Sequence, residues 1–137
     1  MTWIDTHCHI DNNKLSTKIH DVINRSTRSG ISSLVVPATS KNNFDSIIKV
    51  AHEFPQCFFA LGFHPLFIGD YEDGDMDILS AYLKKYNPIA VGEIGVDLFT
   101  RKDNLIQQEN LFVGQLKLAK SFNLPVIIHA RSAIDRV

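Results

Sequence analysis

Cysteine is scarce in this 137-residue sequence, which contains only Cys8 and Cys57. The two residues lie far apart and form no CxxC pair, which excludes a disulfide framework and favours a reducing compartment, so we expect a cytoplasmic protein. Long apolar runs are also missing. None approaches the ~18 to 20 residues that a membrane-spanning helix needs, and no basic stretch followed by an apolar run opens the sequence. We therefore expect no membrane partner.

An excess of one charge is absent as well. The 14 Lys and Arg residues nearly balance the 15 Asp and Glu residues, which leaves a formal net charge of −1. This balance excludes a global basic field, so any binding of a polyanion must be local. The hydrophobic content of 45% is enough to build the core of one domain.

Short apolar runs, rich in β-branched and aromatic residues, alternate with patterns of helical period. The runs predict buried strands at 3–5, 33–37, 57–61, 89–91 and 126–128. Helices are predicted at 15–28, 44–51, 75–86 and 105–119. Apolar strands that alternate with helices indicate an α/β fold with a parallel sheet, either an open doubly wound sheet or a (β/α) barrel.

Polar residues directly follow four of the predicted strands, in the segments DTHCH, GFHP, GEIGVD and HAR. Ligands gather at the carboxyl ends of the strands in both architectures. We therefore expect His7, His9, His64, Glu93 and His129 to converge on one rim of the sheet.

The segment His7-Cys8-His9 combines three residue types that bind metals. Residues two apart on a strand point to the same face, so His7 and His9 can reach one ion while Cys8 points toward the packed helices. We interpret Cys8 as a small buried apolar residue. The HxH pattern is short, and its alternative is a pair of strand-end histidines that bond to backbone carbonyls.

Glu93 and His129 strengthen the metal interpretation. A carboxylate that emerges from the glycine-flanked turn GEIG can bridge two cations, although a surface salt bridge is the alternative for a glutamate alone. Together with His129 it supplies ligands that Zn²⁺ or Mn²⁺ accepts, whereas Mg²⁺ relies on carboxylates and water. Two adjacent cations can activate water and hold phosphate oxygens through an in-line displacement. His64, which precedes Pro65, either faces the substrate or caps a turn.

Several motifs together resemble the TatD family of metal-dependent hydrolases: DTHCHID, VPAT, LGFHP, VGEIGVD, QQENLFVGQLKLAK and LPVIIHAR, in this order from end to end of the chain. The resemblance implies a TIM-barrel-type (β/α)₈ fold related to the amidohydrolases. It also implies a Mg²⁺-dependent deoxyribonuclease of the 3′ to 5′ exonuclease kind, which acts on single-stranded DNA or 3′ ends.

The resemblance implies two divalent metal ions in a complete site, with Mn²⁺ or Zn²⁺ as alternatives to Mg²⁺. It assigns His7 and His9 to the first metal and His129 to the second. Glu93 would bridge both metals and is the predicted catalytic residue.

Three further residues match positions near the site of the family, and the resemblance implies that they bind substrate: His64, Asp97 and Arg131. An arginine at such a position can meet a phosphate oxygen through charge-assisted hydrogen bonds. The alternative for all three is structural support around the metal ligands.

A complete (β/α)₈ barrel runs to about 250 residues. We therefore expect residues 1–137 to form a partial TatD-like domain that holds the first five strands and lacks the C-terminal half, with its closing histidine and aspartate. The open sheet edges of such a domain predict self-association. One alternative function is a catalytically impaired remnant or metal-binding fragment. Another is an amidohydrolase-like hydrolase of a small substrate, which is disfavoured because Glu93 stands where a bridging lysine belongs.

Overall fold

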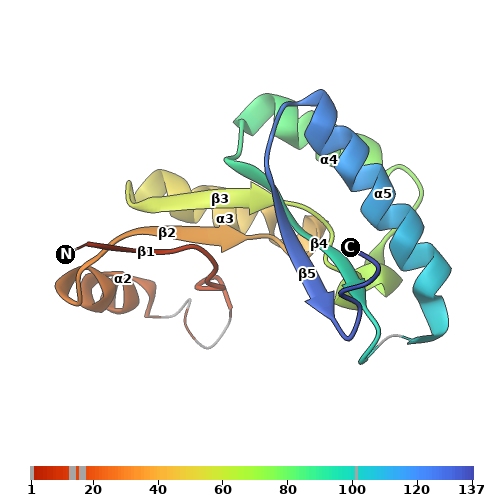
Figure 1. Cartoon of the computed structure of the whole chain (residues 1–137). Coiled ribbons are helices and arrows are strands. Elements are labelled where there is room, and N and C mark those ends of the chain that lie inside the picture. The colour runs from red at the N-terminus through yellow and green to blue at the C-terminus, as the bar shows by residue number, and fades with distance from the viewer. Residues whose placement is uncertain (1, 13–14, 16–17, 101) are drawn as a thin grey trace.

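The computed structural model describes residues 2–12, 15, 18–100 and 102–137. Strands and helices alternate along these residues (Figure 1). The strands are β1 (Trp3–Asp5), β2 (Ile31–Pro37), β3 (Cys57–Leu61), β4 (Ala90–Asp97) and β5 (Val126–Arg131). The helices are α2 (Ile19–Arg28), α3 (Phe44–Glu53), α4 (Asp75–Tyr86) and α5 (Leu105–Ser121). Within the helix predicted over 15–28, α2 covers Ile19–Arg28 and Leu15 is helical as well, whereas positions 16–17 lie outside the described residues.

The five strands are all parallel and pair in chain order, β1-β2-β3-β4-β5. An open doubly wound sheet reverses its strand order at a switch point, whereas a barrel adds each strand beside the last one. Figure 1 shows the sheet curling from β1 to β5, with α2 below β1 and β2, α3 behind β2 and β3, and α4 and α5 beyond β4. The strand order and the curl select the barrel-type arrangement that the sequence predicts.

The core lies between the sheet and the helices. Val36 of β2, Leu61 of β3 and Ile94 of β4 are fully buried there. Helix α3 contributes Phe44 and Ile47, which are fully buried as well.

Strand β4 is longer than the sequence predicts, and this changes the setting of Glu93. The strand continues through Asp97 and pairs with β5, so Glu93 lies inside a buried strand and the predicted GEIG turn is wrong. Gly95 explains the difference, because it has φ +145° and a side chain there would collide with the backbone carbonyl of His129. The glycine permits a close strand contact and does not mark a turn.

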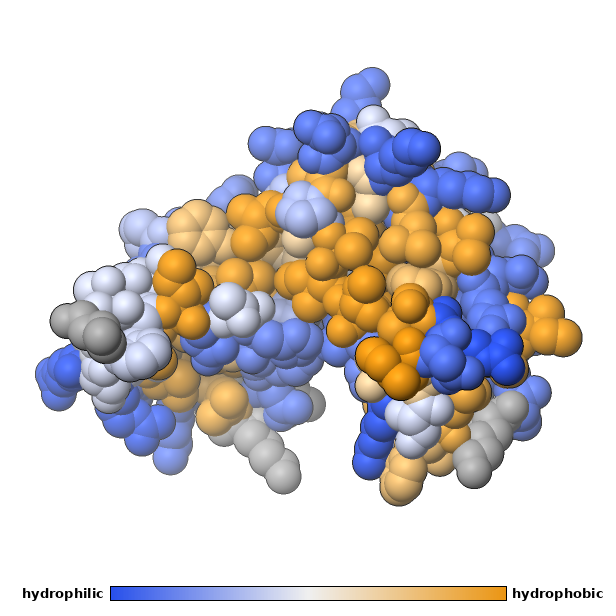
Figure 2. Space-filling model, viewed as in Figure 1, coloured by the Kyte–Doolittle hydropathy of each residue, from blue (hydrophilic) through white to orange (hydrophobic). Residues whose placement is uncertain are grey.

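Apolar side chains remain exposed on both outer strands. Trp3 and Ile4 of β1 are 60% and 62% exposed, and Ile128 of β5 is 45% exposed. Figure 2 shows apolar side chains gathered over the strands on this face of the molecule, with a hollow between the segment after β1 and the end of β5. Within the described parts of the chain, no helix is long and apolar enough to cross a membrane.

Candidate metal centre

Five side chains from four segments meet at the carboxyl edge of the sheet. His7 and His9 follow β1, and His64 follows β3. Glu93 lies within β4 and His129 within β5. Because the strands are parallel, all four segments reach the same edge, and the convergence expected from the sequence is what the structure shows.

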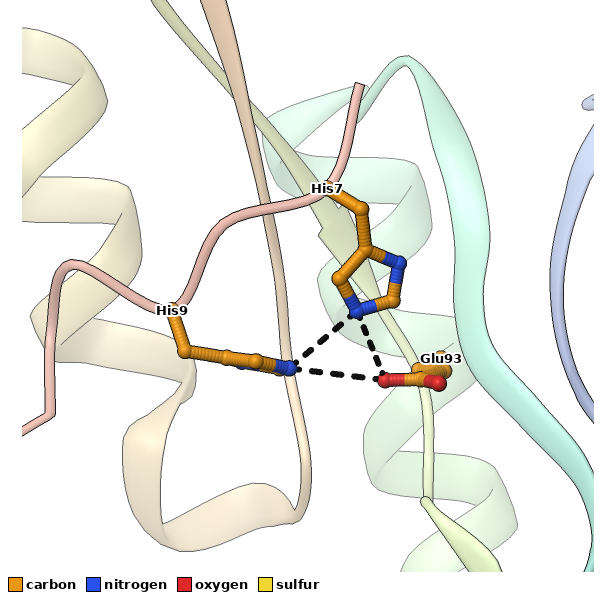
Figure 3. A group of neighbouring side chains, drawn as sticks. All are labelled: His7, His9 and Glu93. Carbon is orange, nitrogen blue, oxygen red and sulfur yellow. Dashed lines mark hydrogen bonds and ion pairs between the residues drawn. The ribbon is translucent and has the colours of Figure 1, made fainter. Parts of the chain in front are cut away.

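The first group consists of His7, His9 and Glu93 (Figure 3). The Nε2 atoms of the two histidines lie 3.2 Å apart. Glu93 Oε2 lies 3.1 Å from Nε2 of His7 and 3.5 Å from Nε2 of His9. The two imidazoles and the carboxylate therefore point their ligand atoms at one small space, as a tripod of metal ligands does.

The second group consists of His64, Glu93 and His129. Glu93 Oε1 lies 3.2 Å from Nδ1 of His129 and 3.6 Å from Nε2 of His64. These two histidine nitrogens are 3.1 Å from each other. The carboxylate thus divides its oxygens, with Oε2 facing the pair after β1 and Oε1 facing the other pair, which is the arrangement of a bridging ligand.

Glu93 is buried, with only 5% of its surface exposed. Burial acts to raise its pKa, but hydrogen bonds from His64 and His9 and the charges of the histidines outweigh burial and hold the pKa well below its usual range. The hydrogen bond between His9 and Glu93 also raises the pKa of His9, against the opposing effect of burial. Glu93 is therefore an anion at neutral pH and fits a site for cations.

A chain of hydrogen bonds sets the protons on His64 and His129. The backbone N–H of Leu66 donates to Nδ1 of His64 at 3.0 Å, so the proton of neutral His64 sits on Nε2. Nε2 of His129 lies 2.9 Å from Asp97 Oδ2, which can only accept, so His129 carries its proton on Nε2. By this assignment from the network, Nδ1 of His129 presents a lone pair to the centre, while His64 presents an N–H.

Asp97 lies behind His129 and is completely buried. Burial acts to raise its pKa, but the backbone N–H of Thr100, the His129 side chain and the N–H of Phe99 together hold the pKa below its usual value. Its Oδ1 accepts from both backbone groups, at 2.7 Å from Thr100 and 3.0 Å from Phe99. All these contacts fix the orientation of the His129 ring.

Two glutamines of α5 support the site from the helix side. Buried Gln108 accepts from the N–H of Asp97 at 2.7 Å and donates to its carbonyl at 3.2 Å. Buried Gln115 binds both backbone groups of Phe63 in the same way, at 2.7 and 3.1 Å. Gln108 thus holds the backbone of Asp97 itself, and Gln115 holds the residue that precedes His64. The sequence did not predict either role, although the glutamines stand seven residues apart on one helix face.

Two other predicted residues lie outside the ligand groups. Cys8 is half-buried and not fully buried as expected; it packs against the core, and its backbone N–H donates to the carbonyl of Val35 at 3.0 Å. Burial raises the pKa of its thiol to about 12, so it stays protonated. Arg131 is exposed at the end of β5, with its guanidinium 3.9 Å from the ring centre of Phe99.

The donor set fits divalent metal ions. Within each group the candidate ligand atoms lie within 4.8 Å of one another. Neutral imidazoles combined with one ionised carboxylate suit Zn²⁺ or Mn²⁺, whereas Mg²⁺ prefers oxygen ligands and retains water. The arrangement can therefore hold two neighbouring cations that share Glu93.

The sequence was compared with models of known protein families. A family model described as TatD related DNase matches residues 4–137. The chain belongs to the TatD-related DNase family. The resemblance seen in the sequence motifs is thereby confirmed.

Members of this family are similar to the chain in sequence and in structure. It is 36% identical to the uncharacterized metal-dependent hydrolase YjjV of Escherichia coli K12, with 98% of this chain and 53% of that protein covered. The crystal structure of YjjV matches with a TM-score of 0.93, over 97% of this chain and 52% of that one. The five-stranded arrangement is thus the TatD barrel fold over half its length.

Two other relatives have names that describe an activity. The chain is 30% identical to a putative deoxyribonuclease, tatdn3, of Danio rerio, with 96% of this chain and 54% of that protein covered. It is 27% identical to a 3′-5′ ssDNA/RNA exonuclease, TatD, of Escherichia fergusonii, with 85% and 45% covered. The chain spans about half the length of the curated relatives it matches.

Proposed function

We propose that this chain supplies the metal-binding half of a divalent-metal-dependent phosphodiesterase that trims single-stranded DNA or RNA from the 3′ end. The observation that carries the proposal is the division of the Glu93 carboxylate between two histidine pairs. The names of the relatives from Danio rerio and Escherichia fergusonii support a nucleic-acid substrate. In this proposal, residues 1–137 form a partial TatD-like domain.

His7, His9 and Oε2 of Glu93 would hold one ion, and Oε1 of Glu93 with Nδ1 of His129 would hold the other. Bound there, two divalent ions supply the positive charge that polarises a phosphodiester and activates an attacking water. Glu93 fixes the positions of both histidine pairs, because its burial and hydrogen bonds leave the carboxylate little freedom. Asp97 holds the proton of His129 on Nε2 and so leaves a lone pair on Nδ1, which would bind the ion in place of the N–H of His64.

His64 would act on the substrate and not as a ligand. Its Nδ1 is occupied by the Leu66 N–H, so the group it offers to the centre is an N–H donor. A donor beside the ions can stabilise a phosphate oxygen as charge develops there. Arg131, exposed beyond His129 on β5, would meet a neighbouring phosphate of the same strand.

The metal used is part of the proposal. The imidazole-rich donor set supports tighter binding of Zn²⁺ or Mn²⁺ than of Mg²⁺. Mg²⁺ would act at its higher cellular concentration, with water in the remaining positions. The two unpaired cysteines support a reducing, cytoplasmic location.

The proposal is tested by comparing Glu93→Ala with His129→Ala. Mn²⁺ and Mg²⁺ binding is measured by calorimetry, and release of the 3′ nucleotide from a labelled single strand is measured with each ion and with EDTA. We expect Glu93→Ala to abolish binding of both ions and all metal-dependent activity, because both sites share its carboxylate. His129→Ala should keep one binding site and lose the other.

The control is His20→Ala, which removes an exposed histidine that pairs with Glu53 and belongs to neither ligand group. It should leave metal binding and activity unchanged. Equal, mild effects of Glu93→Ala and His129→Ala on metal binding would contradict the shared ligand. Tight metal binding without any turnover would favour the metal-binding fragment in place of the enzyme.

A further inference from the structure

A cavity of ≈ 800 Å³ adjoins the metal centre, between the segments that follow β1, β2 and β3. His9 and His64 line both this cavity and the candidate ligand groups, so a molecule in the cavity would touch the centre directly. Its size lies within the range of roughly 300–1,000 Å³ that is typical of small-molecule sites. The cavity therefore has room for a nucleoside beside a phosphate held at the centre.

The charge of the cavity excludes phosphate as its main occupant. Its described lining residues include Asp11 and Asp70 but no lysine or arginine. Lys41, next to the lining residues Ser40 and Asn42 in sequence, is bound to Glu72 and Asp75 at 2.6 and 2.8 Å. An uncharged group rich in hydrogen-bond donors suits such a lining, whereas an anion is repelled by it.

An aromatic ring stands at the side of the cavity next to the centre. Phe67 is 43% exposed, and its ring lies edge-on to that of His64 with the ring centres 6.0 Å apart. An exposed ring of this kind is a stacking surface for a nucleobase. Such stacking does not depend on which base is present. The neighbouring polar side chains of Thr39, Asn42 and Ser46 offer hydrogen bonds to the base edge or the sugar.

The cavity is held in shape by one asparagine. Oδ1 of Asn43 accepts from the backbone N–H groups of Thr39 and Ser40 at 3.1 and 3.3 Å. Its Nδ2 donates to Asp11 at 2.8 Å, which ties the segment after His9 to the segment after β2. A wall fixed in this way needs no ordering when a ligand enters, which favours specific binding.

We infer that this cavity binds the nucleoside attached to the phosphate that is cleaved, with its base stacked on Phe67. The inference rests on the proposed function for its phosphate, but the nucleoside contact itself needs no metal. Nucleoside binding in the cavity would make the site prefer unpaired strand ends, because only an unstacked base can turn into the cavity.

The first test uses nucleosides without metal. Saturation-transfer NMR in EDTA is recorded with thymidine and deoxyadenosine, and with deoxyribose as the probe that lacks a base. We expect transfer to the base protons with the unmodified chain, and at least a roughly fivefold loss with Phe67→Leu. The control is Phe58→Leu, a 40% exposed phenylalanine at the opposite end of β3. Circular dichroism verifies that both variants fold.

The second test compares two single strands, one with an ordinary 3′ nucleotide and one whose 3′ residue is abasic. Phe67→Leu should lower kcat/KM about tenfold on the ordinary end and less than about twofold on the abasic end. Equal losses on both ends, or equal NMR transfer with Phe67→Leu and Phe58→Leu, would overturn the inference and leave the proposed function standing. Saturation transfer to nucleosides that depends on Phe67, without hydrolysis of either strand, would support nucleoside binding in the cavity and would contradict the proposed phosphodiesterase activity.

Discussion

At the scale of single residues, the protons on two histidines decide what each can do. His64 and His129 lie 3.1 Å apart and face the same carboxylate, yet the network gives one an N–H and the other a lone pair. Leu66 and Asp97 cause the difference, because one donates to His64 and the other accepts from His129. Two residues of the same type therefore have different proposed roles.

His64→Gln is expected to separate substrate contact from metal binding. The amide of glutamine retains an N–H donor but not the position of the imidazole. We expect metal affinity to stay within about threefold, since His64 offers no lone pair, while kcat/KM falls roughly 10- to 100-fold. Calorimetry with Mn²⁺ and single-strand hydrolysis measure the two effects. Loss of one bound ion in this variant would show that His64 is a ligand.

Asp97→Asn is expected to lower stability in a way that depends on pH. The pKa of Asp97 is below its unfolded value of about 3.9, so its stabilising contribution is fully present above that pH and is lost as the pH falls through the folded value. The variant should be less stable by roughly 1–3 kcal/mol at pH 7, because it replaces a charged acceptor of buried hydrogen bonds.

Urea unfolding in EDTA at pH 7 and at pH 3 measures this effect, with exposed Asp73→Asn as the control. The difference between Asp97→Asn and the unmodified chain should shrink at pH 3. A destabilisation that is the same at both pH values would show that the aspartate acts through its shape and not its charge.

At the scale of elements, helix α5 and strand β4 hold the site together. Gln108 of α5 hydrogen-bonds to the backbone of Asp97 at the end of β4, and Gln115 to the backbone of Phe63 just after β3. Gly95 lets β5 approach β4 closely enough to bring His129 beside Glu93. The ligand positions thus depend on residues that carry no metal chemistry.

Gln115→Leu is expected to destabilise the fold by roughly 2–4 kcal/mol, because it leaves the buried N–H and carbonyl of Phe63 without their partner. The matched control is Gln107→Leu, an exposed glutamine on the same helix, which should change stability by less than about 0.5 kcal/mol. Thermal and urea unfolding measure both. Equal effects of the two substitutions would show that the backbone contacts of Gln115 contribute little.

At the scale of the whole molecule, the sheet has two outer strands with apolar side chains exposed. Ile4 of β1 and Ile128 of β5 lie on these edges, and the edge strands present unpaired backbone groups as well. We propose that the 137-residue chain, prepared by itself, associates with a second copy through these edges. Such association removes apolar surface from water and pairs the open edges.

Size-exclusion chromatography with light scattering tests the association. We expect a dimer or larger species that shifts toward monomer in Ile4→Lys, because a charge on the edge strand opposes pairing. A stable soluble monomer that binds no hydrophobic dye would contradict this proposal.

Local features of the sequence are enough to predict the fold class, the family and the convergence of five polar side chains on one edge of the sheet. Alternating apolar runs and helical periods predict the parallel sheet, and the polar residues after the strands predict the edge. These features are local in sequence, so they can be read without coordinates. The separation of Cys8 from His7 and His9 also follows from the period of an extended chain.

The folded chain is needed to see how Glu93 divides its oxygens, where the histidine protons lie and which glutamines support the strand ends. These depend on contacts between residues far apart in the chain, such as Gln115 with Phe63. GEIGVD misled the prediction because glycine and acidic residues usually mark turns, whereas here the glycine permits a strand contact and the acids are buried against histidines. Side-chain partners at that distance along the chain leave no periodic signal in the sequence.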